Sequence, residues 1–250
     1  MNSFCIATWN LNYLSPNSER VKVCRAKMLD IKADVWILTE TWKGFQPGED
    51  HRLIAASTLA SDLSCDRRWT VIWARTSLNG SQIDTRDPER TACARIVLPN
   101  GLSLYVYGTV LPWRGSSWRG KKSAGGHAFS EALAVQKADW VDIRKNDPEA
   151  LLCVAGDFNQ DLLANGHYYG SKRECKLLEE ALAQANLNCF TSGASDPVAK
   201  LDPQKATVDH ICLGATQPIL SGVNVHAWSP VQQERQLSDH YGISMRFVYA

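Results

Sequence analysis

Several short apolar runs in this sequence are followed at once by polar side chains. Three such runs cover residues 4–7, 35–38 and 151–155. Runs of this length, bounded by polar residues, are typical of strands that are buried on both faces. Polar residues that follow neighbouring strands meet at one edge of a sheet. The sequence therefore predicts a buried sheet whose rim collects polar groups from distant parts of the chain.

The polar residues at these strand ends form an ordered series. The segments that carry them are Thr8-Trp9-Asn10, Leu38-Thr39-Glu40, Gly156-Asp157-Phe158-Asn159, Thr207-Val208-Asp209-His210 and Ser238-Asp239-His240. A Gly-Asp-x-Asn or a Ser-Asp-His match alone is weak. In this combination and order they resemble the endonuclease/exonuclease/phosphatase superfamily, which has the deoxyribonuclease-I-like fold. The resemblance covers nearly the whole chain.

The residue patterns by themselves predict a mixture of helices and strands in one domain over residues 1–250, because no linker or low-complexity segment divides the chain. The resemblance implies an α+β fold, a four-layer α/β/β/α sandwich of two packed mixed sheets flanked by helices. The expected strands are 4–11, 35–40, 69–74, 92–98, 102–111, 151–157, 208–213, 223–228 and 242–248, and the expected helices lie near 21–29 and over 128–144 and 173–185.

Composition narrows the cellular context. No apolar run reaches the roughly 18 residues of a membrane span, and no signal peptide precedes the first strand, so we expect a cytoplasmic protein without membrane contact. The eight cysteines include no Cys-x-x-Cys pair, and we expect reduced thiols rather than a disulfide framework or a zinc site. The net charge of +1 excludes a strong positive field over the whole molecule.

A divalent metal is expected from the types of side chain at the strand ends. The resemblance implies that Glu40 is the main ligand, with Asn10 and Asp239 completing the shell directly or through water. Carboxylate and amide oxygens are the hard donors that Mg²⁺ or Mn²⁺ prefers.

Four further residues are candidates for the chemistry of hydrolysis. Asp157 follows a buried run and can accept a proton from the attacking water or orient it. Asn159, two residues on, should point to the same side in extended geometry and donate to a phosphoryl oxygen. The resemblance implies that Asp209 fixes or charges His240, which contacts a non-bridging phosphate oxygen. His210, next to Asp209, should point to the opposite face.

The chain departs from the family at one strand. The family usually carries a Tyr or His just before the proline of this strand, whereas Thr109 and Val110 stand here before Leu111-Pro112. Tyr107 on the same strand and His127 in the next segment are alternative leaving-group acids. A metal-bound water could take their place.

Residues 113–122 form a glycine-broken segment rich in cations and tryptophan. Its candidate substrate-binding residues are Trp113, Arg114, Trp118, Arg119, Lys121 and Lys122. Exposed aromatic rings stack on unpaired bases and cations neutralise phosphates, so the segment favours nucleic acid as the partner. An ordinary solvated loop is the alternative.

Three functions remain open on the sequence. The leading one is a Mg²⁺- or Mn²⁺-dependent phosphodiesterase, a nuclease that cleaves DNA or RNA by in-line attack of water. The second keeps the site but acts on a small or lipid phosphoester, of the inositol phosphate or sphingomyelin type. The third is a binding protein that has lost catalysis, which the missing Tyr or His allows.

Overall fold

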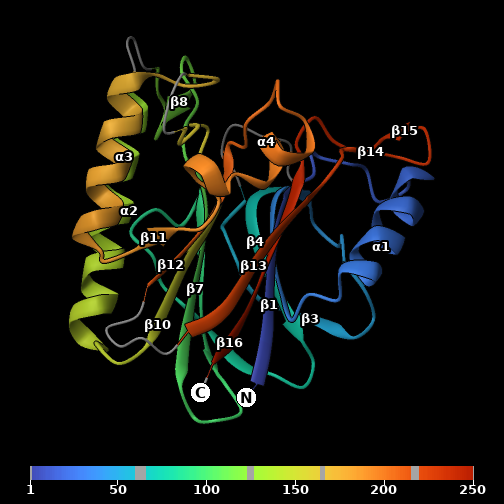
Figure 1. The fold of residues 1–250 in the computed structure, drawn as a ribbon, viewed down its shortest axis with the longest axis horizontal. Helices are drawn as coiled ribbons and strands as arrows, with labels where there is room; N and C mark the ends of the chain where they lie inside the picture. The colour runs from blue at the N-terminus through green and yellow to red at the C-terminus, as the bar shows by residue number, and fades with distance from the viewer. Residues whose placement is uncertain (1, 60–65, 123–126, 164–166, 215–219, 250) are drawn as a thin grey trace.

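Two six-stranded sheets pack face to face, with helices on their outer surfaces (Figure 1). The computed structural model describes residues 2–59, 66–122, 127–163, 167–214 and 220–249. The expected α/β/β/α sandwich of mixed sheets is confirmed. The strands are β1 (Asn2–Asn10), β2 (Val35–Trp42), β3 (His51–Ala56), β4 (Arg67–Arg75), β5 (Asn79–Ile83), β6 (Thr91–Val97), β7 (Ser103–Val110), β8 (Ser117–Trp118), β9 (Lys121–Lys122), β10 (Leu151–Asp157), β11 (Asn188–Cys189), β12 (Asp209–Gly214), β13 (Leu220–Trp228), β14 (Val231–Gln232), β15 (Arg235–Gln236) and β16 (Gly242–Tyr249).

The first sheet has the strand order β13-β16-β1-β2-β4-β3 and the second has the order β11-β12-β10-β7-β6-β5. Each contains one parallel pair, β1 with β2 and β7 with β10. Parallel neighbours end at the same edge, so the carboxyl ends of these four strands lie at the end of the molecule opposite the two termini (Figure 1).

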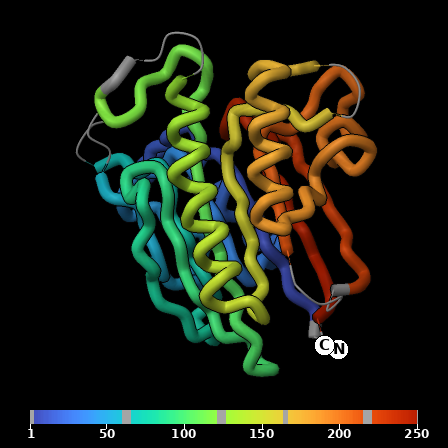
Figure 2. Tube along the Cα trace, turned by 90° about the vertical axis from the view of Figure 1, so that its left-hand side faces the viewer, coloured from blue at the N-terminus to red at the C-terminus, as the bar shows by residue number. Residues whose placement is uncertain are grey.

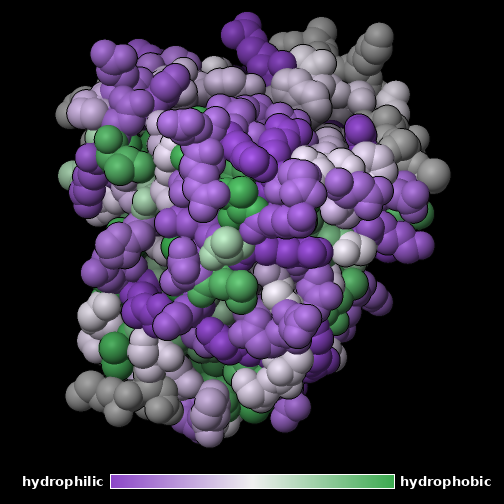
Figure 3. Space-filling model, turned by 90° about the vertical axis from the view of Figure 1, so that its right-hand side faces the viewer, coloured by the Kyte–Doolittle hydropathy of each residue, from purple (hydrophilic) through white to green (hydrophobic). Residues whose placement is uncertain are grey.

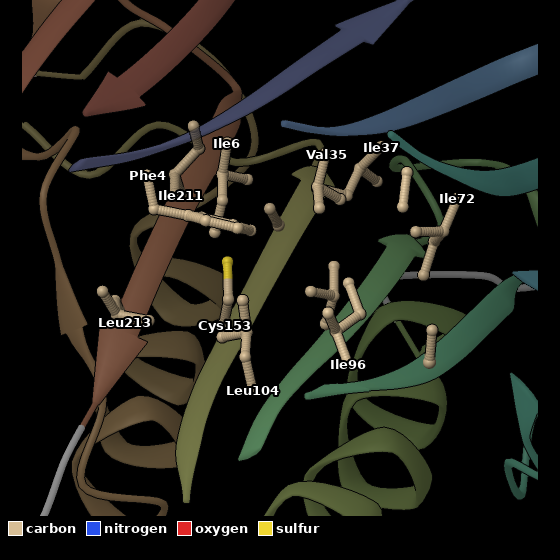
Figure 4. Close-up of a cluster of buried hydrophobic side chains, with 14 of the residues drawn as sticks. Phe4, Ile6, Val35, Ile37, Ile72, Ile96, Leu104, Cys153, Ile211 and Leu213 are labelled. Atoms are coloured by element: carbon tan, nitrogen blue, oxygen red, sulfur yellow. The ribbon is translucent and has the colours of Figure 1, made fainter. Parts of the chain in front are cut away.

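Apolar side chains from the inner faces of both sheets form the central core. Figure 4 shows Phe4, Ile6, Val35, Ile37 and Ile72 of the first sheet facing Ile96, Leu104, Cys153, Ile211 and Leu213 of the second. All ten are buried. Strands covered on both faces need apolar residues at nearly every position, which explains the unbroken runs in the sequence.

Helices α2 (His127–Asn146) and α3 (Lys172–Gln184) lie side by side over the outer face of the second sheet (Figure 2). Helix α1 (Arg20–Ile31) covers the first sheet by packing Val21, Cys24 and Met28 against it. The surface on that side of the molecule is mainly hydrophilic, with a small central group of hydrophobic side chains (Figure 3). A short helix, α4 (Pro197–Leu201), follows a 3₁₀ turn, η1 (Gly193–Ser195), near the polar end.

The structure adds elements that the sequence patterns did not indicate. Strands β3 and β5 form the outer edges of the two sheets, and β8 and β9 make a small hairpin within the cation-rich segment. Strand β5 is almost entirely polar, and its pairing with β6 comes from backbone hydrogen bonds.

The seven described cysteines are free thiols. Within the described residues, no helix is long and apolar enough to cross a membrane.

Candidate active site

The polar ends of four strands and one loop converge between the two sheets. Asn10 ends β1, Glu40 lies near the end of β2, and Asp157 ends β10. Asp209, the first residue of β12, lies directly opposite Asp157 in the antiparallel register. His240 joins them from the loop before β16, where its Nδ1 lies 2.6 Å from Oδ2 of Asp209. The structure therefore brings the catalytic and metal candidates of the strand ends to one place.

Asp157 is buried and held by amide donors on both carboxylate oxygens. Asn10 donates its side-chain amide to Oδ2 at 3.0 Å, and Asn159 donates its side-chain amide to the same oxygen at 3.1 Å. The backbone N–H of Asn159 donates to Oδ1 at 2.9 Å. Burial raises the pKa of Asp157 to about 7; the charge of His240 opposes this shift, and those of Asp209 and Glu40 add to it.

Asn159 lies beside Asp157 because the backbone turns between them, not because the strand continues in extended geometry. Strand β10 ends at Asp157, and Asn159 has the left-handed backbone angle φ of +49°. The hydrogen bond from the Asn159 N–H to the Asp157 carboxylate closes an Asx-type turn. The side-chain amide also donates to the Leu111 carbonyl at 2.9 Å. The expectation of strand alternation was therefore wrong at Asn159, although the two side chains do meet.

Glu40 has an unusual backbone for a glutamate in a strand. Its φ is +50°, a left-handed value that costs energy in non-glycine residues and is concentrated at functional sites. Its carbonyl accepts the Tyr13 N–H at 2.7 Å, which links β2 to the loop after β1. Burial raises the pKa of the Glu40 carboxyl, and a hydrogen bond from Asn10 partly offsets this. The Glu40 carboxylate is therefore destabilised in this surrounding.

His240 and Asp209 form a closely bonded pair. Burial lowers the pKa of His240, but the carboxylates of Asp209 and Asp157 outweigh that effect and raise it well above its usual value. The imidazole is thus cationic near neutral pH. The second carboxylate oxygen of Asp209, Oδ1, is buried and has no hydrogen-bond partner among the described residues. Asp239 is mostly exposed, and its Oδ1 lies 4.0 Å from Nε2 of His240.

The cluster carries more negative than positive charge in a small volume. The donor atoms of Asp157, Asp209 and His240 lie within 4.8 Å of one another, and Glu40 adds a further carboxylate within electrostatic range. One imidazolium cannot balance three carboxylates, and the neighbouring carboxylates add to the burial that raises the pKa values of Asp157 and Glu40. The donors are hard oxygens without a thiolate, which suits a divalent cation such as Mg²⁺. The residues present therefore fit a metal of this class.

Tyr107 is not placed to act as the leaving-group acid. It is fully buried in the layer between the second sheet and α2, and its hydroxyl donates to Oδ2 of Asp139 at 3.0 Å. Burial and the charge of Asp139 raise its pKa well above the usual value. Thr109, on the same strand face, donates to Gln136 of α2. The tentative assignment of Tyr107 was wrong, because its strand face points towards α2.

His127, the other tentative acid, is exposed at the first residue of α2. Among the described residues, those that form the polar cluster and line its pocket do not include His127. Its role stays a prediction. His210 is buried on the opposite face of β12 from Asp209, as expected, and its Nε2 donates to the Gln160 carbonyl at 2.9 Å.

The cation-rich segment divides into an exposed and a buried part. Trp113 is 38% exposed and packs at 6.1 Å against Trp69, and Arg114 is exposed beside it. Trp118 is only 8% exposed, its indole N–H donates to Asp87, and the Arg119 guanidinium covers its ring at 4.4 Å. The expectation that Trp118 offers a free stacking surface was wrong. The side chains of Lys121 and Lys122 lie outside the described residues.

A pocket of about 440 Å³ opens beside the cluster and has a wall that the sequence did not reveal. Asn159, Asp209 and His240 line its base, and Tyr168, Tyr169 and Lys205 line its side. The two tyrosines are 42% and 41% exposed, and the Lys205 ammonium lies 5.8 Å from the Tyr168 ring centroid. The only sequence signal was a Tyr-Tyr pair about ten residues after Asp157, which by itself is not specific.

Asp161 fixes the loop that carries these tyrosines. Its buried carboxylate accepts the backbone N–H groups of Tyr168 at 2.7 Å and Tyr169 at 2.6 Å. The carbonyl of Tyr169 accepts the side-chain amide of Gln160 at 3.1 Å. Burial and the charges of Asp157 and Asp239 raise the pKa of Tyr169, which places its phenol near the cluster. The rings are thus held at the pocket by the segment that follows the catalytic strand.

Comparison with known proteins gives the same fold. The catalytic domain of human Nocturnin with a bound sulfate anion has a TM-score of 0.64 at 16% identity, covering 99% of this chain and 95% of that one. TDP2 of D. rerio, humanized by 14 mutations, has a TM-score of 0.62 at 20% identity, covering 98% and 99%. The endonuclease domain of the telomere-specific retrotransposon TRAS1 has a TM-score of 0.64 at 14% identity, covering 99% of both chains.

No curated protein matches this chain in sequence. A family model nevertheless matches residues 7–240, a range that contains every strand-end residue of the cluster. The chain belongs to the endonuclease/exonuclease/phosphatase family.

Proposed function

We propose that this phosphoester hydrolase is a divalent-metal-dependent nuclease that cleaves DNA or RNA by in-line attack of water. The observation that carries the proposal is the convergence of Asn10, Glu40, Asp157, Asp209 and His240 at one buried rim. Such a cluster can bind a phosphate, activate water and stabilise the charge that develops on the phosphoryl oxygens.

Each residue has a role that follows from its contacts. Glu40, with Asn10 and Asp239, would hold Mg²⁺ or Mn²⁺, which supplies charge neutralisation at the phosphate when bound. Cationic His240, held by Asp209, donates to a non-bridging phosphate oxygen. Asp157 accepts the proton of the attacking water, since its raised pKa suits a general base near neutral pH. Asn159 orients Asp157, because its backbone and side-chain N–H groups both donate to that carboxylate.

The pocket wall favours a nucleotide over a simple phosphoester. Tyr168 and Tyr169 offer aromatic faces in the pocket that Asp209 and His240 also line, and Lys205 adds a cation beside Tyr168. Aromatic faces stack on bases of any sequence, and a lysine neutralises an adjacent phosphate. Trp113 and Arg114 provide a second exposed aromatic and cationic pair just after β7, whose last residue, Val110, pairs with Asp157. Among the similar structures, one of D. rerio TDP2 is a complex with single-strand DNA product.

A substrate panel tests the proposal. Single- and double-stranded DNA, RNA, a bis-aryl phosphodiester and an inositol polyphosphate are incubated with Mg²⁺, with Mn²⁺ and with EDTA. We expect metal-dependent cleavage of at least one nucleic acid, loss of activity in EDTA, and strongly slowed turnover in Glu40→Gln. Glu49→Gln, at an exposed position, is the matched control and should retain activity. Full activity in excess chelator would contradict the metal mechanism. Cleavage of the inositol polyphosphate alone would favour a small-phosphoester enzyme instead.

A further inference from the structure

Two cysteines face each other at the edge of the second sheet, away from the polar cluster. Strands β11 and β12 lie side by side (Figure 1), and Cys189 of β11 pairs directly with Cys212 of β12 in the antiparallel register. The adjacent pair, Phe190 and Ile211, carries a backbone hydrogen bond from the Phe190 N–H to the Ile211 carbonyl. Bonded and non-bonded pairs alternate in an antiparallel ladder, so Cys189 and Cys212 form a non-hydrogen-bonded pair.

That register suits a disulfide. Opposite residues of a non-hydrogen-bonded pair have Cα atoms about 4.5 Å apart with side chains on the same face. Disulfides span Cα separations of about 4.4–6.8 Å, so the two sulfurs can join without moving either strand. Both cysteines pack in the same apolar layer between the second sheet and its covering helices.

A histidine is positioned to receive the proton of Cys189. Nδ1 of His210 lies 3.6 Å from Sγ of Cys189 and 2.8 Å from Oγ1 of Thr191. Nε2 of His210 must carry a hydrogen, because its partner at 2.9 Å is the Gln160 carbonyl, which only accepts. Nδ1, the basic nitrogen of the neutral ring, therefore faces both the Thr191 hydroxyl and the Cys189 thiol. Burial raises the pKa of Cys189, but the Cys212 and His210 contacts outweigh it and lower it well below the usual value.

A small molecule can reach Cys189 but not its partner. Cys189 is partly exposed and lines a surface groove of about 610 Å³ together with Leu162, Leu182, Asn186 and Ser192. Cys212 is fully buried behind it. This is the arrangement of an accessible attacking thiol backed by a shielded resolving thiol.

We propose that Cys189 and Cys212 form a reactive dithiol site that hydrogen peroxide oxidises to a cross-strand disulfide. The Cys189 thiolate attacks one peroxide oxygen, the O–O bond breaks, and the leaving hydroxide takes the proton held by His210 and departs as water. The sulfur of Cys212 then attacks the Cys189 sulfenic acid, the S–O bond breaks, and the hydroxide leaves with the Cys212 proton as a second water. Two thiols lose two electrons and one peroxide is reduced to two waters.

Peptide mapping of the unmodified protein tests the site directly. Trypsin releases Cys189 in the peptide 177–200 and Cys212 in the peptide 206–235, and neither contains another cysteine. After brief exposure of the native protein to hydrogen peroxide and blocking of the remaining thiols, we expect these two peptides to be joined. The joined species should separate on addition of dithiothreitol. Because the wild-type chain is used, the result does not depend on a variant that folds.

Two variants and one internal control sharpen the test. Cys212→Ser should stop the reaction at a sulfenic acid on Cys189 that dimedone captures, and Cys189→Ser should leave Cys212 reduced. Cys175 on α3 is the internal control, because burial raises its pKa to about 11. Cys189 should be oxidised at least about tenfold faster than Cys175. Oxidation of Cys175 before Cys189, or conversion of Cys189 to a sulfonic acid while Cys212 stays reduced, would overturn the proposal. Neither result would affect the proposed hydrolase, whose residues lie on the other face of β12.

Discussion

At the scale of single residues, Asp157 and His240 should carry most of the catalytic effect. Asp157→Asn removes the proposed base while keeping the amide contacts nearly isosteric, and His240→Ala removes the cation that faces the phosphate. Each change should lower kcat by on the order of 10²-fold or more in a protein that still folds cooperatively. His226→Ala, at an exposed histidine of β13, should leave kcat unchanged. Turnover numbers and melting curves measured in parallel check this; a wild-type rate in Asp157→Asn would exclude the base.

Tyr168 and Tyr169 should determine how well a polynucleotide binds. Tyr168→Ala and Tyr169→Ala should each lower kcat/KM for nucleic acid by a factor equivalent to about 1–3 kcal/mol, the usual contribution of one base stack. Neither change should much affect cleavage of a bis-aryl phosphodiester. Tyr168→Phe should behave as wild type, because stacking uses the ring and not the hydroxyl. If Tyr169→Phe strongly lowers kcat only for substrates with poor leaving groups, the phenol of Tyr169 instead assists the departing oxygen.

The sequence predicted which residues gather at the polar cluster better than it predicted their surroundings. Asn10, Glu40, Asp157, Asp209 and His240 lie at fixed places relative to buried strands, and alternation along a strand is enough to place His210 opposite Asp209. The path of the chain after a strand ends is set by turn chemistry and by distant partners. Asn159 therefore reaches Asp157 by an Asx turn, and Tyr168 and Tyr169 reach the pocket through Asp161, neither of which a pattern of apolar residues encodes.

At the scale of elements, the cation-rich segment should show two separable effects. Trp118 packs among the side chains of α2 and the second sheet, so Trp118→Ala should lower the free energy of unfolding by about 3–5 kcal/mol. Trp113 is exposed, so Trp113→Ala should cost little stability and instead raise KM for nucleic acid. Urea denaturation and steady-state kinetics on both variants distinguish the two roles. Equal loss of stability in both would mean that Trp113 is structural as well.

The elements that sequence patterns fail to predict are those whose structure depends on contacts with neighbouring elements. Strand β5 has three polar residues, one glycine and one isoleucine, and only its backbone pairing with β6 makes it a strand. Strand β3 alternates irregularly because its register with β4 shifts between Leu53 and Ala55. The prediction that Trp118 is exposed failed for a related reason. Its indole turns inward because its N–H donates to Asp87, a contact with a residue distant in the sequence. Buried central strands can be predicted from their apolar composition, whereas edge strands and loops depend on tertiary contacts.

At the scale of the whole molecule, the charge imbalance of the cluster should couple folding to pH and to metal. Asp157 has a folded pKa of about 7, above its unfolded value of 3.8, so its protonated form favours the folded state. Its stabilising contribution is complete below about pH 4 and is lost as the pH rises through 7. His240 also has a raised pKa, and its contribution is lost at still higher pH. The metal-free protein should therefore become less stable from weakly acidic to weakly alkaline solution.

Bound Mg²⁺ should reverse that trend, because a divalent cation favours the ionised carboxylates that destabilise the metal-free fold. The rise in melting temperature on replacing EDTA by excess Mg²⁺ should be small at about pH 5 and larger at about pH 8. In Asp157→Asn the decline of the EDTA curve between about pH 4 and 7 should flatten, since the neutral amide does not titrate there. Differential scanning calorimetry of both proteins in both media measures all four curves. An equal Mg²⁺ effect at the two pH values would show that the cation binds away from the carboxylate cluster, because only binding at the cluster competes with its protons.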